Sequence, residues 1–242
     1  MRLTRVYSEE PLTAGKSFTL AGSAANHIMR VLRLRQGDAL TLFDGRGGEY
    51  GARITGFRKD SVQADVLEHR DVERESPLLL TLAQGVSRGE RMDWVVQKAT
   101  ELGVQRIIPV LTERSVVKLD ERQSERKTQH WRAIAISACE QCGRNRLPEV
   151  TAATGLHDVI RSVDASTTRV LLSPLGKLRA RDLVGAASIT MLIGPEGGLS
   201  ENEQEAAVRA GFQQVSMGPR ILRTETAAVA ALAAFQHDFG DL

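Results

Sequence analysis

The stretch Met191-Leu-Ile-Gly-Pro-Glu-Gly-Gly-Leu-Ser200 decides how the second half of this chain is interpreted. An apolar run from Ile189 to Ile193, interrupted only by Thr190, predicts a buried strand that ends at the glycine-rich turn. Ser200 and Glu203 have the spacing of a capping box, which predicts that a helix begins there. A strand, a glycine-rich turn and a helix N-terminus form a common place for an α/β protein to bind a small ligand.

Glu196 argues against a phosphate ligand at this turn, because its carboxylate would repel a phosphate. The turn also lacks the Lys-Ser/Thr end of a phosphate loop and the spacing of a dinucleotide-binding fingerprint. A ligand with a positive charge or an amino group fits Glu196 better. The alternative is a tight turn that binds nothing, since glycine-containing turns between strands and helices are common.

The bulk composition is that of an ordinary globular protein. The chain has 242 residues, 42% of them hydrophobic and 26% charged, which is enough for a sizeable core in one or two domains. No apolar run approaches the roughly 20 residues that span a bilayer, and the charged N-terminus does not resemble a signal peptide. With only two cysteines, we expect a cytoplasmic protein without a disulfide framework and without a membrane partner.

Arginine is the preferred base: the 32 basic residues are 26 arginines and 6 lysines. Arginine binds phosphates in a forked geometry and stacks on bases, which favours an RNA partner. Codon bias in a GC-rich genome explains the same excess. The net charge of only +2 does not decide between the two explanations.

The first 70 residues predict a small β-barrel with one helix. The expected strands are 17–20, 39–43, 49–57 and 61–67, and the turns are 44–48 and 58–60. Ser23 is expected to cap the helix, with Ala24, Ile28 and Val31 on its apolar side. His27, Arg30 and Arg33 would follow one flank, either to contact phosphates or as a solvated face.

A charged, proline-terminated segment, 70–77, predicts the domain boundary. From Leu78 strands and helices alternate, which predicts a mainly parallel sheet covered by helices on both faces. The expected strands are 78–83, 106–111, 170–173, 189–193 and 214–217, and the expected helices are 87–102, 121–142, 200 onward and 224–239.

Three further motifs carry polar groups. Cys139 and Cys142 have thioredoxin-like spacing, but they lie at a helix C-terminus and lack further ligands, so we interpret them as structural and expect no metal. Gly143-Arg-Asn-Arg146 follows them and predicts an anion or RNA contact, with a solvated loop as the alternative. Ser87-Arg-Gly-Glu-Arg91 places two arginines at the carboxyl end of a strand, where open α/β sheets bind ligands.

Met217-Gly-Pro-Arg-Ile-Leu-Arg-Thr-Glu-Thr-Ala227 repeats the design of the first glycine–proline turn. A strand ends at Gly218-Pro219, and Thr224 is expected to cap the helix that follows. Arg220, Arg223 and Glu225 crowd one turn, which a core position would not tolerate. The helix is rich in small residues nearly all round, which is typical of a buried helix or of one packed against a second subunit.

Both glycine–proline motifs, together with His27-Ile-Met-Arg-Val-Leu-Arg33, Ser87-Arg-Gly-Glu-Arg-Met92 and Cys139-Glu-Gln-Cys-Gly-Arg-Asn-Arg146, resemble the SPOUT class of methyltransferases. More narrowly they resemble the RsmE family, whose members methylate N3 of a uridine in 16S ribosomal RNA. The likeness extends over the whole chain and is weakest from about 150 to 185.

The resemblance implies a PUA-like β-barrel at 1–72 and a SPOUT α/β domain with a C-terminal trefoil knot at 73–242. It also implies a homodimer, a 16S rRNA or small-subunit substrate, and S-adenosylmethionine as the cofactor. The implied cofactor-binding residues are Leu172, Ser173, Gly194, Pro195, Glu196, Gly197, Gly198, Met217, Gly218, Ile221, Leu222, Arg223 and Thr226. The residues expected to contact RNA are Arg5, His27, Arg30, Arg33, Arg88, Arg144, Asn145, Arg146 and Arg220.

The cofactor suits Glu196, since its sulfonium and its amino acid tail carry positive charge. Uracil N3–H is only weakly acidic, so we hypothesise that Arg223 stabilises the developing anion and that Glu225 or a water accepts the proton. The resemblance does not settle these roles. A non-enzymatic RNA-binding or ribosome-assembly factor would use the barrel and the arginines equally well, but it leaves the two glycine–proline turns unexplained.

Overall fold

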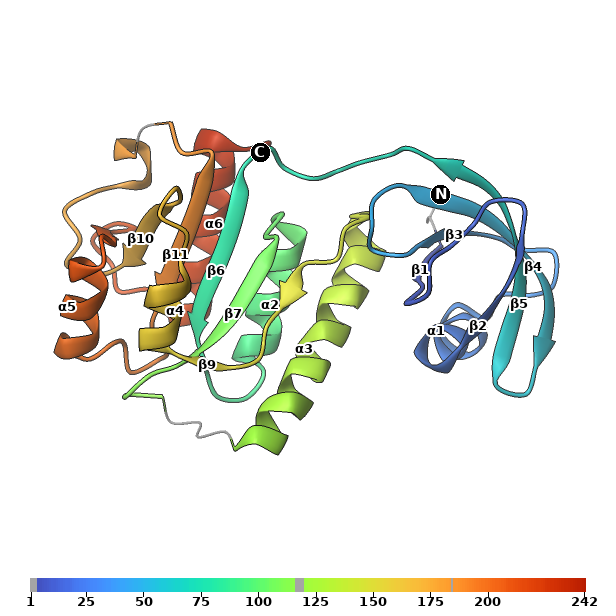
Figure 1. The fold of residues 1–242 in the computed structure, drawn as a ribbon, viewed down its shortest axis with the longest axis horizontal. Helices are drawn as coiled ribbons and strands as arrows, with labels where there is room; N and C mark the ends of the chain where they lie inside the picture. The colour runs from blue at the N-terminus through green and yellow to red at the C-terminus, as the bar shows by residue number, and fades with distance from the viewer. Residues whose placement is uncertain (1–3, 116–119, 184) are drawn as a thin grey trace. The chain divides into compact units, whose positions relative to one another are not determined.

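The computed structural model describes residues 4–115, 120–183 and 185–242, which form two compact units (Figure 1). The first unit contains the chain as far as Glu75 together with Ile136–Leu147, and the second contains Ser76–Ala135 and Pro148–Leu242. Helix α3 (Glu121–Cys142) therefore contributes residues to both units. The domain boundary expected between 72 and 73 stays a prediction, and the compact units differ from it because residues 136–147 pack with the first unit.

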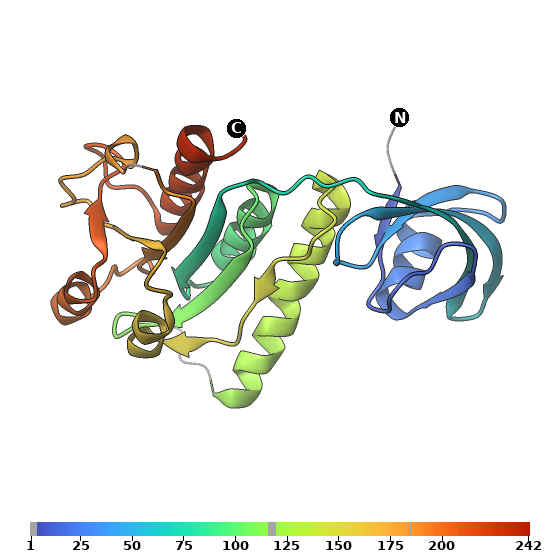
Figure 2. The same cartoon turned by 45° about the horizontal axis from the view of Figure 1, so that its top comes forward.

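A curled five-stranded sheet forms the framework of the first unit (Figure 2). In spatial order its strands are β1 (Arg5–Tyr7), β3 (Ala39–Phe43), β4 (Glu49–Arg58), β5 (Ser61–Arg70) and β2 (Ser17–Ala21). Strand β1 pairs with β3 in parallel and the other neighbours are antiparallel. The alternating apolar residues of these strands fill one core, in which Leu42 and Val62 are completely buried.

The helical segment between β2 and β3 differs from the expected capped α-helix. It consists of α1 (Gly22–Asn26) and a π-helical turn, η1 (His27–Leu32). Ala21 is the N-cap and no side chain makes a cap hydrogen bond, so the expected Ser23 cap is wrong. The wider π turn breaks the α-helical spacing. Ile28 is buried as expected. Val31, which an α-helix would place on the same side, is 67% exposed.

A parallel sheet forms the centre of the second unit. Its strands, in spatial order, are β12 (Gln213–Val215), β10 (Thr168–Leu172), β11 (Ser188–Ile193), β6 (Leu79–Gly85), β7 (Arg106–Leu111) and β8 (Glu149–Val150). The short strand β9 (Thr154–Gly155) also pairs with β7. All these pairs are parallel, as the alternation of strands and helices predicts.

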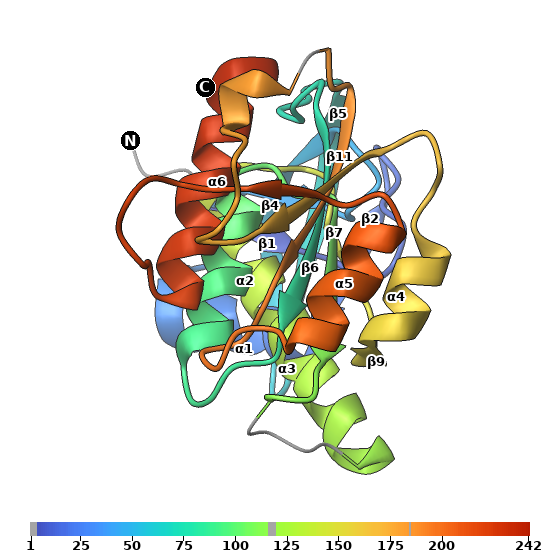
Figure 3. The same ribbon diagram turned by 90° about the vertical axis from the view of Figure 1, so that its left-hand side faces the viewer.

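Helices cover both faces of this sheet (Figure 3). Helices α2 (Arg91–Glu101) and α6 (Thr224–Phe239) lie on one face, and α4 (Leu156–Ser162) and α5 (Glu201–Arg209) lie on the other. A 3₁₀ turn, η2 (Ala180–Asp182), lies in the connection between β10 and β11. Parallel strands buried on both faces are mostly apolar, which explains the run Ile189–Ile193, where Thr190 is the one polar residue.

Three helix starts test the capping predictions. Ser200 caps α5 through the predicted box: its Oγ accepts from the Glu203 N–H at 3.2 Å, and its own N–H donates to Glu203 Oε2 at 2.8 Å. Helix α2 begins at Arg91 rather than Ser87, because Gly89 has a left-handed φ of +61° that interrupts the helix. Helix α6 begins at Thr224 as expected, but its N-cap is Arg223 and Thr224 does not act as the cap.

Candidate active site

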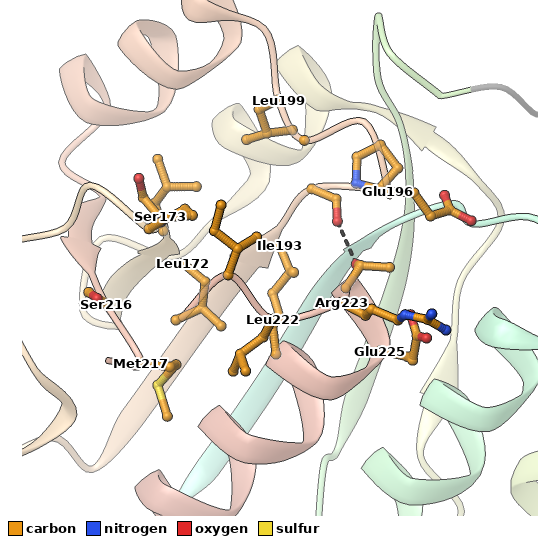
Figure 4. Close-up of a pocket in the computed structure, with 18 of the residues that line it drawn as sticks. Leu172, Ser173, Ile193, Glu196, Leu199, Ser216, Met217, Leu222, Arg223 and Glu225 are labelled. Carbon is orange, nitrogen blue, oxygen red and sulfur yellow. Dashed lines mark hydrogen bonds between the residues drawn. The ribbon is translucent and has the colours of Figure 1, made fainter. Parts of the chain in front are cut away.

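The two glycine–proline loops line one cleft of about 580 Å³ at the carboxyl ends of β10, β11 and β12 (Figure 4). Segments 171–174, 193–199 and 215–225 supply most of the lining. The apolar side chains of Leu172, Ile193 and Leu222 lie at its centre in Figure 4. A cleft of this size, mostly apolar and bounded by a few polar groups, is typical of a small-molecule site.

Close contacts between backbones shape the first loop. A Cβ at Gly194 would lie 2.9 Å from the Gly198 carbonyl carbon and from the Leu199 nitrogen, so a side chain there would force the loop apart. The Gly198 N–H donates to the Pro195 carbonyl at 2.8 Å and closes the turn. The loop therefore presents backbone rather than side chains to the cleft at Gly194 and Gly198.

A buried polar pair ties the first loop to α6. Thr224 Oγ1 donates to the Gly194 carbonyl at 2.6 Å and accepts from Gln84 Nε2 at 2.9 Å. Gln84 is the last residue but one of β6 and is completely buried. Neither role was predicted from the sequence; the local signals are a lone amide near the end of an apolar strand and a threonine hydroxyl at the start of a helix that it does not cap.

The Glu196 carboxylate is already paired. Its Oε1 accepts from Arg91 NH1 at 2.5 Å and from the Arg88 backbone N–H at 3.0 Å. Burial alone would raise the pKa of Glu196, but hydrogen bonds from its own N–H, the Arg88 N–H and the Arg91 guanidinium outweigh it and hold the pKa below its usual range. Glu196 is thus an ion-paired anion, whereas the sequence suggested an uncompensated charge.

Arg223 and Glu225 lie at the same end of the cleft as Glu196 (Figure 4). The Arg223 residue is exposed. The Glu225 side chain is 16% exposed, and its Oε1 lies 3.8 Å from Arg91 Nε. Glu225 Oε2 is buried and has no hydrogen-bond partner among the described residues. The unpaired carboxylate oxygen can accept a hydrogen bond from a proton donor, and the exposed guanidinium beside it can stabilise an anion.

Most of the expected cofactor-binding residues line this cleft. The exceptions are Gly197 and Thr226, and Thr226 is exposed on α6. Arg91, which the sequence placed at the ligand-binding end of a strand, also lines the cleft, together with residues outside the expected cofactor set: Ile193, Leu199, Ser216 and Thr224. The assignment of individual ligands stays a prediction.

The residues expected to contact RNA separate into buried and exposed groups. Arg5, Arg144 and Asn145 are buried within the first unit. Arg5 donates to Glu49 Oε2 at 2.5 Å and to Asn145 Oδ1 at 2.6 Å, and Arg144 donates to both oxygens of Glu75. Their charges are compensated inside the protein, and the sequence could not show this because the partners are distant in the chain. Such burial favours a structural role for these three side chains over a phosphate contact.

The other members of that set are more accessible. His27 is half-buried, whereas Arg30, Arg33, Arg88 and Arg220 are exposed. Arg33 ends η1 in a left-handed conformation, with φ +52°. The Arg146 side chain is 55% exposed and pairs with Glu73. Contact with RNA stays a prediction for all of them.

Both cysteines lie on the last turn of α3, and no disulfide joins them. Burial raises the pKa of the Cys139 thiol to about 12, which makes it unreactive near neutral pH. In the part of the chain that the structure describes, no group of three His, Cys, Asp or Glu side chains could hold a metal ion. No helix over the same residues is long and apolar enough to cross a membrane.

Comparison with known proteins identifies the family. Residues 74–236 match the RNA methyltransferase domain model and residues 20–67 match the RNA methyltransferase PUA domain model. The ribosomal RNA small subunit methyltransferase E of Buchnera aphidicola is 34% identical over 100% of this chain and 98% of its own length. That of Bacillus subtilis is 33% identical over 98% of this chain and 94% of its own. The chain belongs to the ribosomal RNA small subunit methyltransferase E family.

Solved structures of similar proteins agree with this membership. A methyltransferase from Legionella pneumophila with bound SAM has a TM-score of 0.96 and 41% identity over 100% of both chains. Ribosomal RNA small subunit methyltransferase E from Neisseria gonorrhoeae, bound to S-adenosyl methionine, has a TM-score of 0.91 and 39% identity over 99% of both chains. The predicted family, the α/β fold and the PUA-like first unit are thereby confirmed, whereas the trefoil knot and the homodimer stay predictions.

Proposed function

We propose that this chain transfers a methyl group from S-adenosylmethionine to N3 of a uridine in the 16S ribosomal RNA of the small ribosomal subunit, in the cytoplasm. The observation that carries the proposal is the cleft formed by both glycine–proline loops, in a member of a family of small-subunit rRNA methyltransferases. Relatives of 39% and 41% identity contain S-adenosylmethionine, which supports the same cofactor here.

The cleft residues fit this cofactor. A volume of about 580 Å³ lies within the range of roughly 300–1,000 Å³ typical of small-molecule sites. Leu172, Ile193 and Leu222 offer apolar surface to an adenine, and Gly194 lets the loop that borders the cleft fold tightly, because a Cβ there would meet the backbone of Gly198 and Leu199. The cofactor, when bound, supplies an electrophilic methyl group on a sulfonium centre.

The chain's own residues must handle the uridine. N3–H has to lose its proton as the methyl bond forms, and the negative charge spreads onto the neighbouring carbonyl oxygens. We assign Arg223, exposed at the cleft, to stabilise that charge, and Glu225 or a water to accept the proton. Over the described residues Glu225 Oε2 has no hydrogen-bond partner, which supports this assignment because it leaves one acceptor available.

Arg223→Ala tests the role of the guanidinium. We expect the Kd for S-adenosylmethionine to change less than about threefold and the methyl-transfer rate to fall about 100-fold, since loss of one preorganised charge-stabilising group costs about 10² to 10³ in kcat. Calorimetry and single-turnover transfer measure the two quantities. Near-normal turnover would remove Arg223 from the mechanism.

The trefoil knot expected from the resemblance is part of the proposal. After β12, at the edge of the sheet, the chain returns to Thr224, which bonds to Gly194 at the end of β11. The returning segment meets the connection between β10 and β11: Arg179 NH1 donates to the Ser216 carbonyl at 3.3 Å. A Cβ at Gly176 would lie 2.7 Å from the Val215 carbonyl carbon. This close crossing supports a threaded chain.

We also propose a homodimer that uses the small-residue surface of α6. Ala230, Ala233 and Ala234 are only partly buried in the single chain, although α6 is rich in alanine. Such a surface allows close helix packing by a second copy. Light scattering coupled to size-exclusion chromatography measures the mass, and a monomer at micromolar concentration would contradict this part of the proposal.

A further inference from the structure

Arg91 connects the two loops of the cleft. It is the first residue of α2, at the carboxyl end of β6, and lies on neither glycine–proline loop. Its NH1 donates to Glu196 at 2.5 Å, and its Nε lies 3.8 Å from Glu225 Oε1. One guanidinium thus faces a carboxylate of the first loop and a carboxylate of the first turn of α6. The planar, forked geometry of arginine suits such a bridge, and a lysine ammonium does not reproduce it.

The hydrogen bonds of Glu196 direct it toward α2. Its Oε1 accepts from Arg91 and from the Arg88 backbone N–H, and its own N–H adds a third hydrogen bond to the carboxylate. Its negative charge is therefore compensated before any ligand arrives. The same contacts fix the segment 88–91, which carries the exposed side chain of Arg88. Glu196 thereby holds α2 and its preceding loop against the cleft.

Glu225 is oriented by the Nε atom of Arg91, whereas Glu196 binds a terminal nitrogen of the same guanidinium. It lies in the first turn of α6, where the helix dipole favours a negative charge. With Oε1 directed at Arg91 Nε, Oε2 is left buried and without a hydrogen-bond partner among the described residues. An unpaired buried carboxylate oxygen is costly, and a catalytic role is one of the reasons for which folded proteins keep one.

We propose that Arg91 is a positioning residue for methyl transfer, that it orients Glu225 in the cleft, and that Glu196 acts through Arg91 rather than as a ligand of the cofactor's ammonium group. This inference rests on the proposed function. Measurement distinguishes a positioning role of Glu196 from a cofactor-ligand role: loss of a positioning residue lowers kcat, whereas loss of a cofactor ligand raises the Kd for S-adenosylmethionine.

A double-mutant cycle on the full chain separates the two roles. The variants are Glu196→Gln, Arg91→Met and the two combined, with Arg209→Met as the control. Arg209 pairs with Glu205 on α5 at 3.2 Å, both side chains are about two-thirds exposed or more, and neither residue lines the cleft. Calorimetry gives the Kd for S-adenosylmethionine, methyl transfer to small subunits that lack the modification gives kcat and KM, and a thermal melt checks folding.

We expect each single substitution to lower kcat about tenfold or more while the Kd for S-adenosylmethionine changes less than about threefold. The double variant should be no slower than the slower single variant, because both changes break one unit. The control should keep wild-type kcat. A tenfold weaker Kd for Glu196→Gln with normal kcat at saturating cofactor would overturn the proposal, as would additive losses in the double variant.

Arg91→Lys keeps the test decisive if Arg91→Met does not fold. An ammonium retains the charge beside Glu196 but lacks the second, forked contact with Glu225, so kcat should stay at least about fivefold below wild type at unchanged Kd. Wild-type kcat in Arg91→Lys would refute the bridge. A wild-type protein that transfers no methyl group would contradict the proposed function itself, whereas an active wild type with a fully active Arg91 variant would contradict only the role of Arg91.

Discussion

Two clusters in this chain pair arginines with carboxylates, and they differ in what they leave unpaired. In the first unit, Arg144 and Glu75 have side chains only 4% and 14% exposed, and the guanidinium donates to both carboxylate oxygens. In the cleft, Arg91 is 42% exposed, and it stands between two carboxylates, one of which keeps a buried oxygen that has no hydrogen-bond partner in the described part of the chain. Arginine-rich sequence segments thus serve either structure or chemistry, and the buried, two-point Arg144–Glu75 pair differs from the more exposed Arg91, which two carboxylates share.

The buried cluster should show the largest effect on stability. Arg144→Met leaves Glu75 as an uncompensated charge in the first unit, and we expect the free energy of unfolding to fall by about 3–5 kcal/mol. Urea unfolding followed by circular dichroism measures it. Arg146→Met is the matched control, since its pair with Glu73 is exposed and should cost less than about 1 kcal/mol. Equal effects of the two variants would remove the distinction between the clusters.

The hydroxyl of Thr224 should show an intermediate effect. Thr224→Val keeps the shape but removes the 2.6 Å bond to the Gly194 carbonyl and leaves the 3.5 Å approach of Gln84 Nε2, so we expect a loss of about 1–3 kcal/mol. Because the bond shapes the cleft, the Kd for S-adenosylmethionine should also rise. Thr226→Val, exposed on the same helix, should change the free energy of unfolding by less than about 0.5 kcal/mol. If Thr224→Val is equally harmless, the bond does not hold the loop.

The pH dependence of the cleft pair should show the smallest effect. The folded-state pKa of Glu196 is lowered, so its contribution to stability is present above the unfolded value of about 4.5 and is lost as the pH falls through the lower, folded value. The stability difference between wild type and Glu196→Gln should therefore be constant near neutral pH and shrink in acid. Unfolding curves from pH 7 to pH 3 measure it, and a difference that grows in acid would reverse the assigned sign.

Local patterns predicted most of the fold, because they depend on neighbouring residues. The apolar run before Gly194 and the box formed by Ser200 and Glu203 each have a local physical cause, and the structure shows both. The π-helical turn after Asn26 was not predictable, since Val31 fits an α-helical stripe in sequence and yet is exposed. Spacing alone does not reveal a change of helix type.

The candidate site was predictable in outline and not in its pairings. The two glycine–proline turns indicated the cleft, because each motif carries its own strand, turn and helix. The partners of Glu196 and Thr224 come from β6 and the segment after it, about 110 and 140 residues earlier in the chain. Long-range contacts of this kind also explain why Arg144 and Asn145 seemed free to contact RNA in sequence but are buried.

The most direct test of the account is to identify the product. Purified protein is incubated with labelled S-adenosylmethionine and small subunits from cells that lack it, and the RNA is digested to nucleosides for mass spectrometry. We expect close to one N3-methyluridine per subunit, at a single position that blocks reverse transcription because the methyl group occupies the base-pairing edge. A labelled methyl group on another atom or base, or no transfer by a protein that binds the cofactor, would contradict the proposed function.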